Sequence, residues 1–94
     1  MSVVSMDVDR ARHVAREMRA IVSEQRRRMR VLQGLLQEVE RAWLGAAPQQ
    51  YVLRQKAVLH TLAQKVDHLE ALAAELEDEI RKYEEMAQHL DGLL

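Results

Sequence analysis

The chain of 94 residues contains no cysteine, no phenylalanine, one proline and three glycines. The absence of cysteine excludes disulfides, thiolate metal sites and thiol nucleophiles. Aromatic residues are also scarce, since one Trp and two Tyr are the only ones present. The hydrophobic core must therefore be built from Leu, Val, Ile, Met and Ala, a composition that suits the seams between helices better than sheets.

The chain also lacks an excess of charge and any long apolar run. Its 14 basic and 15 acidic residues nearly cancel, so the net charge provides no general attraction to nucleic acid or anionic lipid. No run of 18 apolar residues is present, and several charges lie within residues 1–20. We therefore expect no nucleic-acid binding, no stable membrane insertion and no classical signal peptide.

One short stretch interrupts an otherwise helical pattern, and it holds Trp43, Gly45, Pro48 and Tyr51. Glycine can end a helix in the left-handed conformation, and proline can open the next helix. A connection this short forces two helices to lie antiparallel. The sequence predicts a single domain over residues 1–94, with helices at about 8–42 and 49–90 and a turn at 43–48. Trp43 and Tyr51 are expected to pack together across the bend.

Apolar residues recur every three or four positions on both sides of this turn, which is the heptad pattern of packed helices. Asp7 or Asp9 is expected to cap the first helix, and Asp91 with Gly92 to mark the end of the second. Gln25 and Gln55 are polar interruptions that either fix the register or lie where the bundle opens to water. The predicted dimer seam comprises Met18, Val22, Gln25, Met29, Leu32, Leu36, Leu59, Leu62, Val66, Leu69, Leu76 and Ile80.

The apolar stripes are wider than two helices alone can bury. Additional apolar residues flank the seams, and an isolated helix pair of this size buries little surface. Residues 1–47 hold nine basic and six acidic side chains, whereas residues 48–94 hold five and nine, so the two halves attract each other. The expected fold is all-α: an antiparallel two-helix hairpin that dimerises into a four-helix bundle. The flanking residues are Val14, Ile21, Leu35, Ala42, Val58, Leu72 and Met86.

The turn residues Trp43, Gly45, Ala47 and Tyr51 match the pattern Trp-x-Gly-x-Ala-x-x-x-aromatic. With two helices of about forty residues around it, the chain resembles the WXG family of early secreted antigenic target-like proteins. The resemblance covers essentially the whole chain. It implies a helical hairpin that pairs with itself or with a sister WXG protein, and export through a type VII secretion system.

The resemblance also implies partners and a route out of the cell. An FtsK/SpoIIIE-type ATPase would drive export from the cytoplasm to the outside without a signal peptide, with the turn motif as part of its docking surface. The family's C-terminal export signal is Tyr-x-x-x-Asp/Glu. Here Tyr83 occupies the place of the tyrosine, but Ala87 stands four residues later and the acids Glu84 and Glu85 follow the tyrosine directly. The signal is therefore displaced, or a partner carries it.

Two other groups of residues invite a functional reading. Arg26, Arg27, Arg28 and Arg30 spread around a helix and are expected to form a solvated face, with docking to an acidic partner as the second reading. The four histidines lie off the seams and are expected at the surface. His60 and His68 are too far apart along a helix to share one metal ion. No motif indicates a catalytic, cofactor-binding or metal site.

Three readings of the function follow. The first is a type VII secretion substrate or export partner, dimeric and acting by protein–protein contact rather than catalysis. The second is an intracellular structural or adaptor coiled coil that is not exported. The third, a membrane-active effector, needs an apolar face left free for lipid, whereas the dimer is expected to bury that face.

Overall fold

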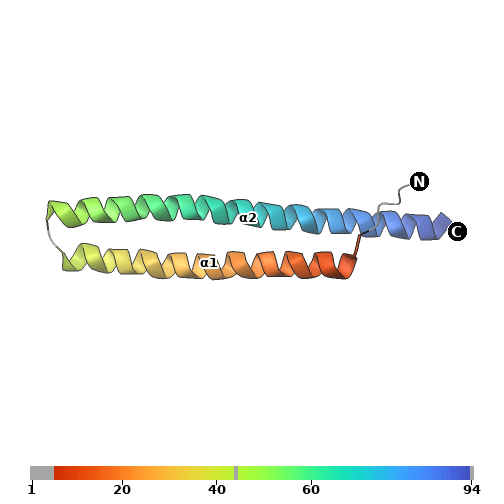
Figure 1. Ribbon diagram of the computed structural model, residues 1–94, viewed down its shortest axis with the longest axis horizontal. Coiled ribbons are helices and arrows are strands. Elements are labelled where there is room, and N and C mark those ends of the chain that lie inside the picture. The colour runs from red at the N-terminus through yellow and green to blue at the C-terminus, as the bar shows by residue number, and fades with distance from the viewer. Residues whose placement is uncertain (1–5, 44, 94) are drawn as a thin grey trace.

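The computed structural model describes residues 6–43 and 45–93, and these residues form two long helices packed side by side as a hairpin. Helix α1 comprises Val8–Ala42 and α2 comprises Ala46–Leu93. The helices run antiparallel along a body of 74 × 20 × 15 Å (Figure 1). The predicted all-α hairpin is thereby confirmed. The expected domain limits at 1–5 and 94, and the middle residue of the Trp-x-Gly motif, lie outside the described residues.

Helix α1 begins and ends as the sequence predicts. Of the two candidate caps, Asp7 is the one used: its carboxylate accepts a hydrogen bond of 3.1 Å from the backbone N–H of Arg10, satisfying one donor of the first turn. At the other end the backbone N–H of Trp43 donates to the carbonyl of Val39 at 3.0 Å. Trp43 itself is extended, so the helix stops at Ala42.

Helix α2 is longer than predicted at both ends. It begins at Ala46, three residues before the expected start, and Pro48 therefore lies in its first turn. Proline is tolerated there because the first N–H groups of a helix have no intrahelical acceptor. Gly45 immediately precedes the helix with a φ of +124°, a conformation that favours glycine. At the far end α2 continues through Asp91 and Gly92 to Leu93.

A single line of side chains from each helix forms the core. The buried apolar residues lie mainly on α2, where they recur every seventh position, and fewer lie on α1. Ala73 is completely buried, which lets the two backbones approach closely at the middle of the hairpin. The buried hydrophobic residues are Ala15, Val22, Val52, Leu59, Val66, Ala73 and Ile80.

The open end of the hairpin is uneven because α2 extends past the beginning of α1 (Figure 1). Leu90 and Leu93 lie in this extension, and both are exposed. Within the described ranges, neither helix offers a stretch both long and apolar enough to cross a membrane.

Candidate interaction surfaces

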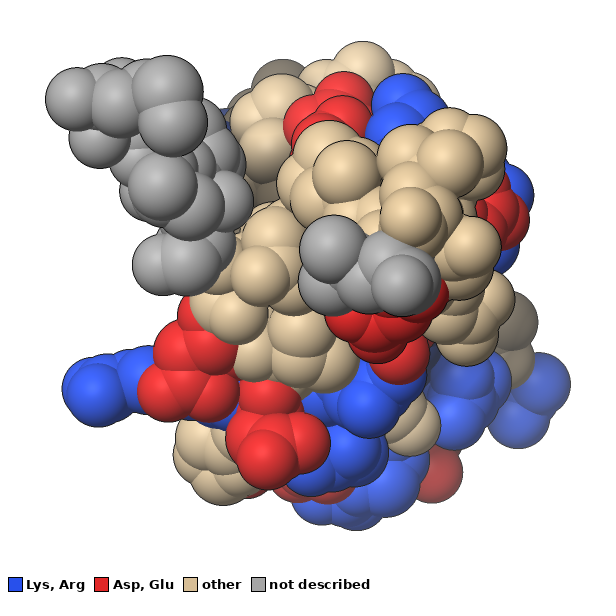
Figure 2. All heavy atoms as spheres, turned by 90° about the vertical axis from the view of Figure 1, so that its right-hand side faces the viewer, with Lys and Arg blue, Asp and Glu red and all other residues tan. Residues whose placement is uncertain are grey.

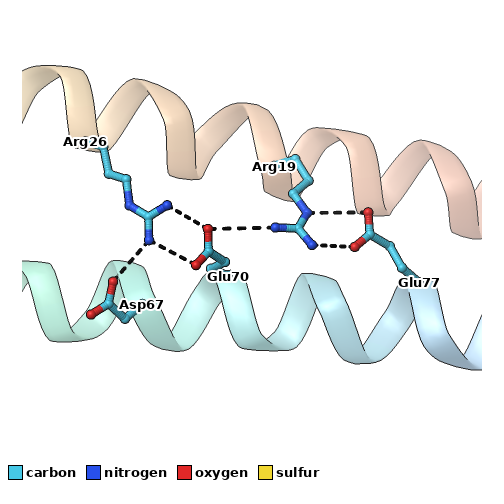
Figure 3. A network of polar contacts seen from close by, with 5 residues as sticks. All are labelled: Arg19, Arg26, Asp67, Glu70 and Glu77. Atoms are coloured by element: carbon cyan, nitrogen blue, oxygen red, sulfur yellow. Dashed lines mark hydrogen bonds and ion pairs between the residues drawn. The ribbon is translucent and has the colours of Figure 1, made fainter.

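A ladder of ion pairs runs along one edge of the hairpin and joins α1 to α2 (Figure 3). Arg26 donates to both carboxylate oxygens of Glu70, at 2.6 and 3.1 Å, and to Asp67 at 3.1 Å. Arg19 contacts both oxygens of Glu77 and lies 3.8 Å from Glu70. Glu70 therefore bridges the two arginines (Figure 3).

The ladder continues toward both ends of the molecule. Arg12 pairs with Glu84 near the open end, and Lys56 lies 2.8 Å from Glu40 near the turn. In these pairs and in Arg19–Glu77 and Arg26–Glu70, the two residue numbers always add up to 96. This constant relation fixes the register of α1 on α2.

The ladder lowers the pKa of Glu70 and of Glu77. The hydrogen bond from Arg26 lowers the pKa of Glu70, and the hydrogen bond from Arg19 lowers the pKa of Glu77. Within α1, hydrogen bonding to Arg27, with a further contribution from Arg28, lowers the pKa of Glu24 to about 2. These pairs are exposed, so each adds modestly to stability while the series fixes the register.

The four arginines of α1 spread around the helix as expected, and three of them are paired with carboxylates. Arg26 belongs to the ladder, whereas Arg27 and Arg28 pair with Glu24 on their own helix at 2.7 and 3.2 Å. The sequence carried a signal for the ladder, because its arginines and its glutamates recur at intervals of seven. The ladder arginines on this spacing are Arg12, Arg19 and Arg26, and the matching glutamates are Glu70, Glu77 and Glu84.

An apolar face lies on the other side of the seam, where the flanking rows of the two helices are exposed. On α1 the row is Val14, Ile21, Arg28, Leu35 and Ala42, and all five are exposed; Ile21 is 48% exposed. In a heptad the two rows that flank the seam lie on opposite edges of the helix pair. The ladder occupies one edge, and the mainly apolar rows occupy the other. On α2 the row is Tyr51, Val58, Lys65, Leu72, Glu79, Met86 and Leu93, and all seven are exposed.

The predicted seam residues line the contact between α1 and α2 to different degrees. Four of them are buried: Val22, Leu59, Val66 and Ile80. Leu32 is 45% exposed and lies beside the apolar face. The remaining seam residues are half-buried: Met18, Gln25, Met29, Leu36, Leu62, Leu69 and Leu76.

The closed end of the hairpin presents aromatic surface. The rings of Trp43 and Tyr51 lie 6.4 Å apart between centroids, as the sequence predicted. Trp43 is nevertheless 52% exposed and Ala47 is also exposed. Trp43 and Gly45 border a shallow hollow of about 490 Å³ that also involves Leu53. The tip is thus an accessible apolar surface.

The residues of the proposed C-terminal signal already take part in contacts within the chain. Tyr83 is half-buried on the side of α2 that faces α1. Glu84 pairs with Arg12, and Glu85 lies 3.2 Å from Arg81. These residues lie toward the C-terminal end of α2, whereas Trp43 follows the last residue of α1 at the turn, so one hairpin holds them at opposite ends.

The four histidines, His13, His60, His68 and His89, are exposed. In the described part of the chain, no three side chains of His, Asp or Glu are arranged to hold a metal ion. Viewed from the open end, uncharged surface covers the end of α2, while most Lys and Arg side chains lie around α1 (Figure 2). The surfaces that distinguish this molecule are therefore the ladder, the apolar face and the aromatic tip.

No protein-family model, curated protein or solved structure matches the chain.

Proposed function

We propose that this protein is a type VII secretion substrate or export partner that works by protein–protein contact. In this proposal two hairpins pair through the apolar face into a four-helix bundle. The observation that carries the pairing is the exposed apolar face on a hairpin whose other edge is sealed by ion pairs. Exposed apolar residues gathered on one face are typical of an interaction site.

Packing energetics support a second copy as the occupant. One hairpin buries only a single line of apolar residues per helix, which is little for a chain of this size. A second hairpin would cover the row that includes Ile21, Leu72 and Met86. The half-buried Met18 and Leu69 would then lie toward the core of the bundle.

Export through a type VII system is supported by the turn. Trp43, Gly45, Ala47 and Tyr51 lie at the closed end of a two-helix hairpin, as in the WXG family, and the indole is accessible there. An FtsK/SpoIIIE-type ATPase would dock at this tip. The protein would be folded in the cytoplasm and released outside the cell.

Light scattering on the purified chain tests the pairing, and a mass of twice 10.9 kDa is expected. A monomer at all concentrations would contradict self-pairing. A chain that becomes a stable dimer only with a sister WXG protein would assign the apolar face to a heterodimer.

Export is tested in a producing strain by comparing culture medium with and without the FtsK/SpoIIIE-type ATPase. The protein is expected in the medium only when the ATPase is present. Trp43→Ala should reduce export, whereas Val31→Ala, an exposed apolar residue on α1 away from the turn, serves as the control. A protein that stays in the cell with an active system supports the adaptor reading instead.

A further inference from the structure

We infer that Lys65 and Glu79 select a second antiparallel copy of this chain and set the register in which the two copies pair. The inference rests on the self-pairing proposed above. Lys65 and Glu79 would decide which partner binds to the apolar face and in which alignment.

The exposed row of α2 has a symmetric order about its middle. Leu72 is the centre, with one charged residue seven positions away on each side: Lys65 before it and Glu79 after it. The next pair outward is apolar on both sides, Val58 and Met86. The outermost pair is Tyr51 and Leu93.

Two copies can stack face to face about a two-fold axis perpendicular to their long dimension. The α2 helix of one copy then lies against α2 of the partner and runs antiparallel to it. When the axis passes beside Leu72, each residue meets the one equally distant on the other side of the centre. Lys65 then faces the partner's Glu79, and the same pair forms a second time by symmetry. Val58 meets the partner's Met86, so apolar residues also meet apolar residues.

Every other alignment of the row is worse. A shift that centres the axis on Lys65 or on Glu79 brings two like charges together. The axis can also lie midway between two neighbouring members of the row. Lys65 and Glu79 then face apolar residues of the partner or lie outside the contact. Like charges in contact and unpaired charges both oppose association.

A parallel arrangement of the two hairpins is also disfavoured. The register of the ion-pair ladder places Lys65 of α2 level with residue 31 of α1, between Arg28 and Leu35 of the exposed row. With the closed ends together, Arg28 would approach the partner's Lys65, and Glu79 would face Val14 and Ile21. In this arrangement neither charge of the α2 row meets an opposite charge, whereas the antiparallel copy pairs both Lys65 and Glu79.

Charge reversal tests the inference directly. Glu79→Lys makes both charges of the row positive, and Lys65→Glu makes both negative. Each variant alone is expected to dimerise on the order of tenfold more weakly than the native chain, because both contacts become repulsive. Mixing the two variants restores opposite charges at both contacts, so a heterodimer is expected. Native mass spectrometry resolves these species.

Matched controls reverse the same kinds of charge away from the apolar face. Arg81→Glu and Glu85→Lys alter exposed residues on the outer side of α2, and both should dimerise like the native chain. Circular dichroism on every variant separates loss of pairing from loss of helix. If Glu79→Lys and Lys65→Glu dimerise as well as these controls, the inference is wrong while self-pairing stands.

Cysteine crosslinking tests the register itself, because the chain has no cysteine of its own. Leu72→Cys should give a covalent dimer on oxidation, since this position meets itself at the axis. Val58→Cys and Met86→Cys should crosslink efficiently only when mixed. Crosslinking of Val58→Cys with itself would show another register or orientation of the two copies and overturn the inference, and a native chain that is monomeric would remove the proposed pairing as well.

Discussion

The ring of Trp43 lies 6.4 Å from the ring of Tyr51, and the two planes are inclined by 48°. Trp43 follows the last residue of α1, and Tyr51 lies in the second turn of α2. The contact therefore spans the turn and holds together the beginning of one helix and the end of the other.

Tyr51→Ala is expected to destabilise the hairpin by about 0.5–1.5 kcal/mol, the range for a tilted aromatic pair. Trp43 is the only tryptophan, so its emission reports on the tip alone. The emission should shift to longer wavelength as the indole loses its neighbour. Unchanged emission together with unchanged stability would show that the two rings do not pack in solution.

Gly45 and Gly34 should respond to alanine with opposite signs. At Gly45 an added Cβ meets Pro48 Cδ only at 3.9 Å, so the cost comes from the φ of +124°, and Gly45→Ala should lose about 1–2 kcal/mol. At Gly34, inside α1 with open space around it, alanine should add about 0.5–1 kcal/mol. Urea unfolding measures both. A gain at Gly45 would mean that the turn has another conformation.

Ile80 and Ile21 provide a matched pair for the two apolar surfaces. Ile80 is buried between the helices, so Ile80→Ala should cost about 2–5 kcal/mol at any protein concentration. Ile21 lies on the apolar face, so Ile21→Ala should mainly change how the melting temperature depends on concentration. Melting curves at several concentrations separate the two effects. Equal, concentration-independent losses would argue against a free apolar face on the hairpin.

Stability should decrease in acid. The folded-state pKa values of Glu70 and Glu77 lie below the ordinary value of 4.5 because of their arginine partners. The stabilisation from each carboxylate is therefore complete above that value and is lost as the pH falls through the lowered pKa. For Glu24 the loss extends to a pH of about 2.

Melting temperatures between pH 7 and pH 2 measure this loss. Glu70→Gln combined with Glu77→Gln should make the acid part of the curve flatter, because two linked protonations are removed. Glu75→Gln is the control, since this exposed carboxylate lies outside the ladder. An equally steep curve for the double variant would show that the ladder contributes nothing to acid sensitivity.

Gln25→Leu should leave the fold intact or make it more stable. Gln25 is half-buried in an otherwise apolar seam, and leucine there would bury apolar surface in place of an amide. Sedimentation and thermal melting together measure assembly and stability. A marked loss of dimer on this change would show that the amide determines the pairing.

Much of this architecture was predictable from the sequence because its signals are local. The heptad spacing and Asp7 defined α1 from Val8 to Ala42, as observed. The start of α2 was harder, because Pro48 fits any position of a first turn and does not mark which one. Gly92 was expected to end α2, but one glycine costs a helix only about 1 kcal/mol, and the helix continues through it.

The ladder required knowledge of how the helices align. The opposite charges of the two halves predicted attraction, but not that Arg26 would bridge Asp67 and Glu70. The sequence indicated that adjacent arginines point in different directions around a helix, but not which of them has a partner on α2. Arg26 thus joins α2 while Arg28 pairs with Glu24 of its own helix.

The ion-pair ladder lies on one edge of the hairpin, and in the proposed pairing this would limit how large an assembly can grow. Two copies joined through the apolar face, as proposed, would each present the ladder on the opposite edge, so a third copy would find no second apolar edge of this kind. Such a closed pair would remain a dimer at high concentration. A hairpin with an apolar surface on both edges would instead bind further copies and form a filament.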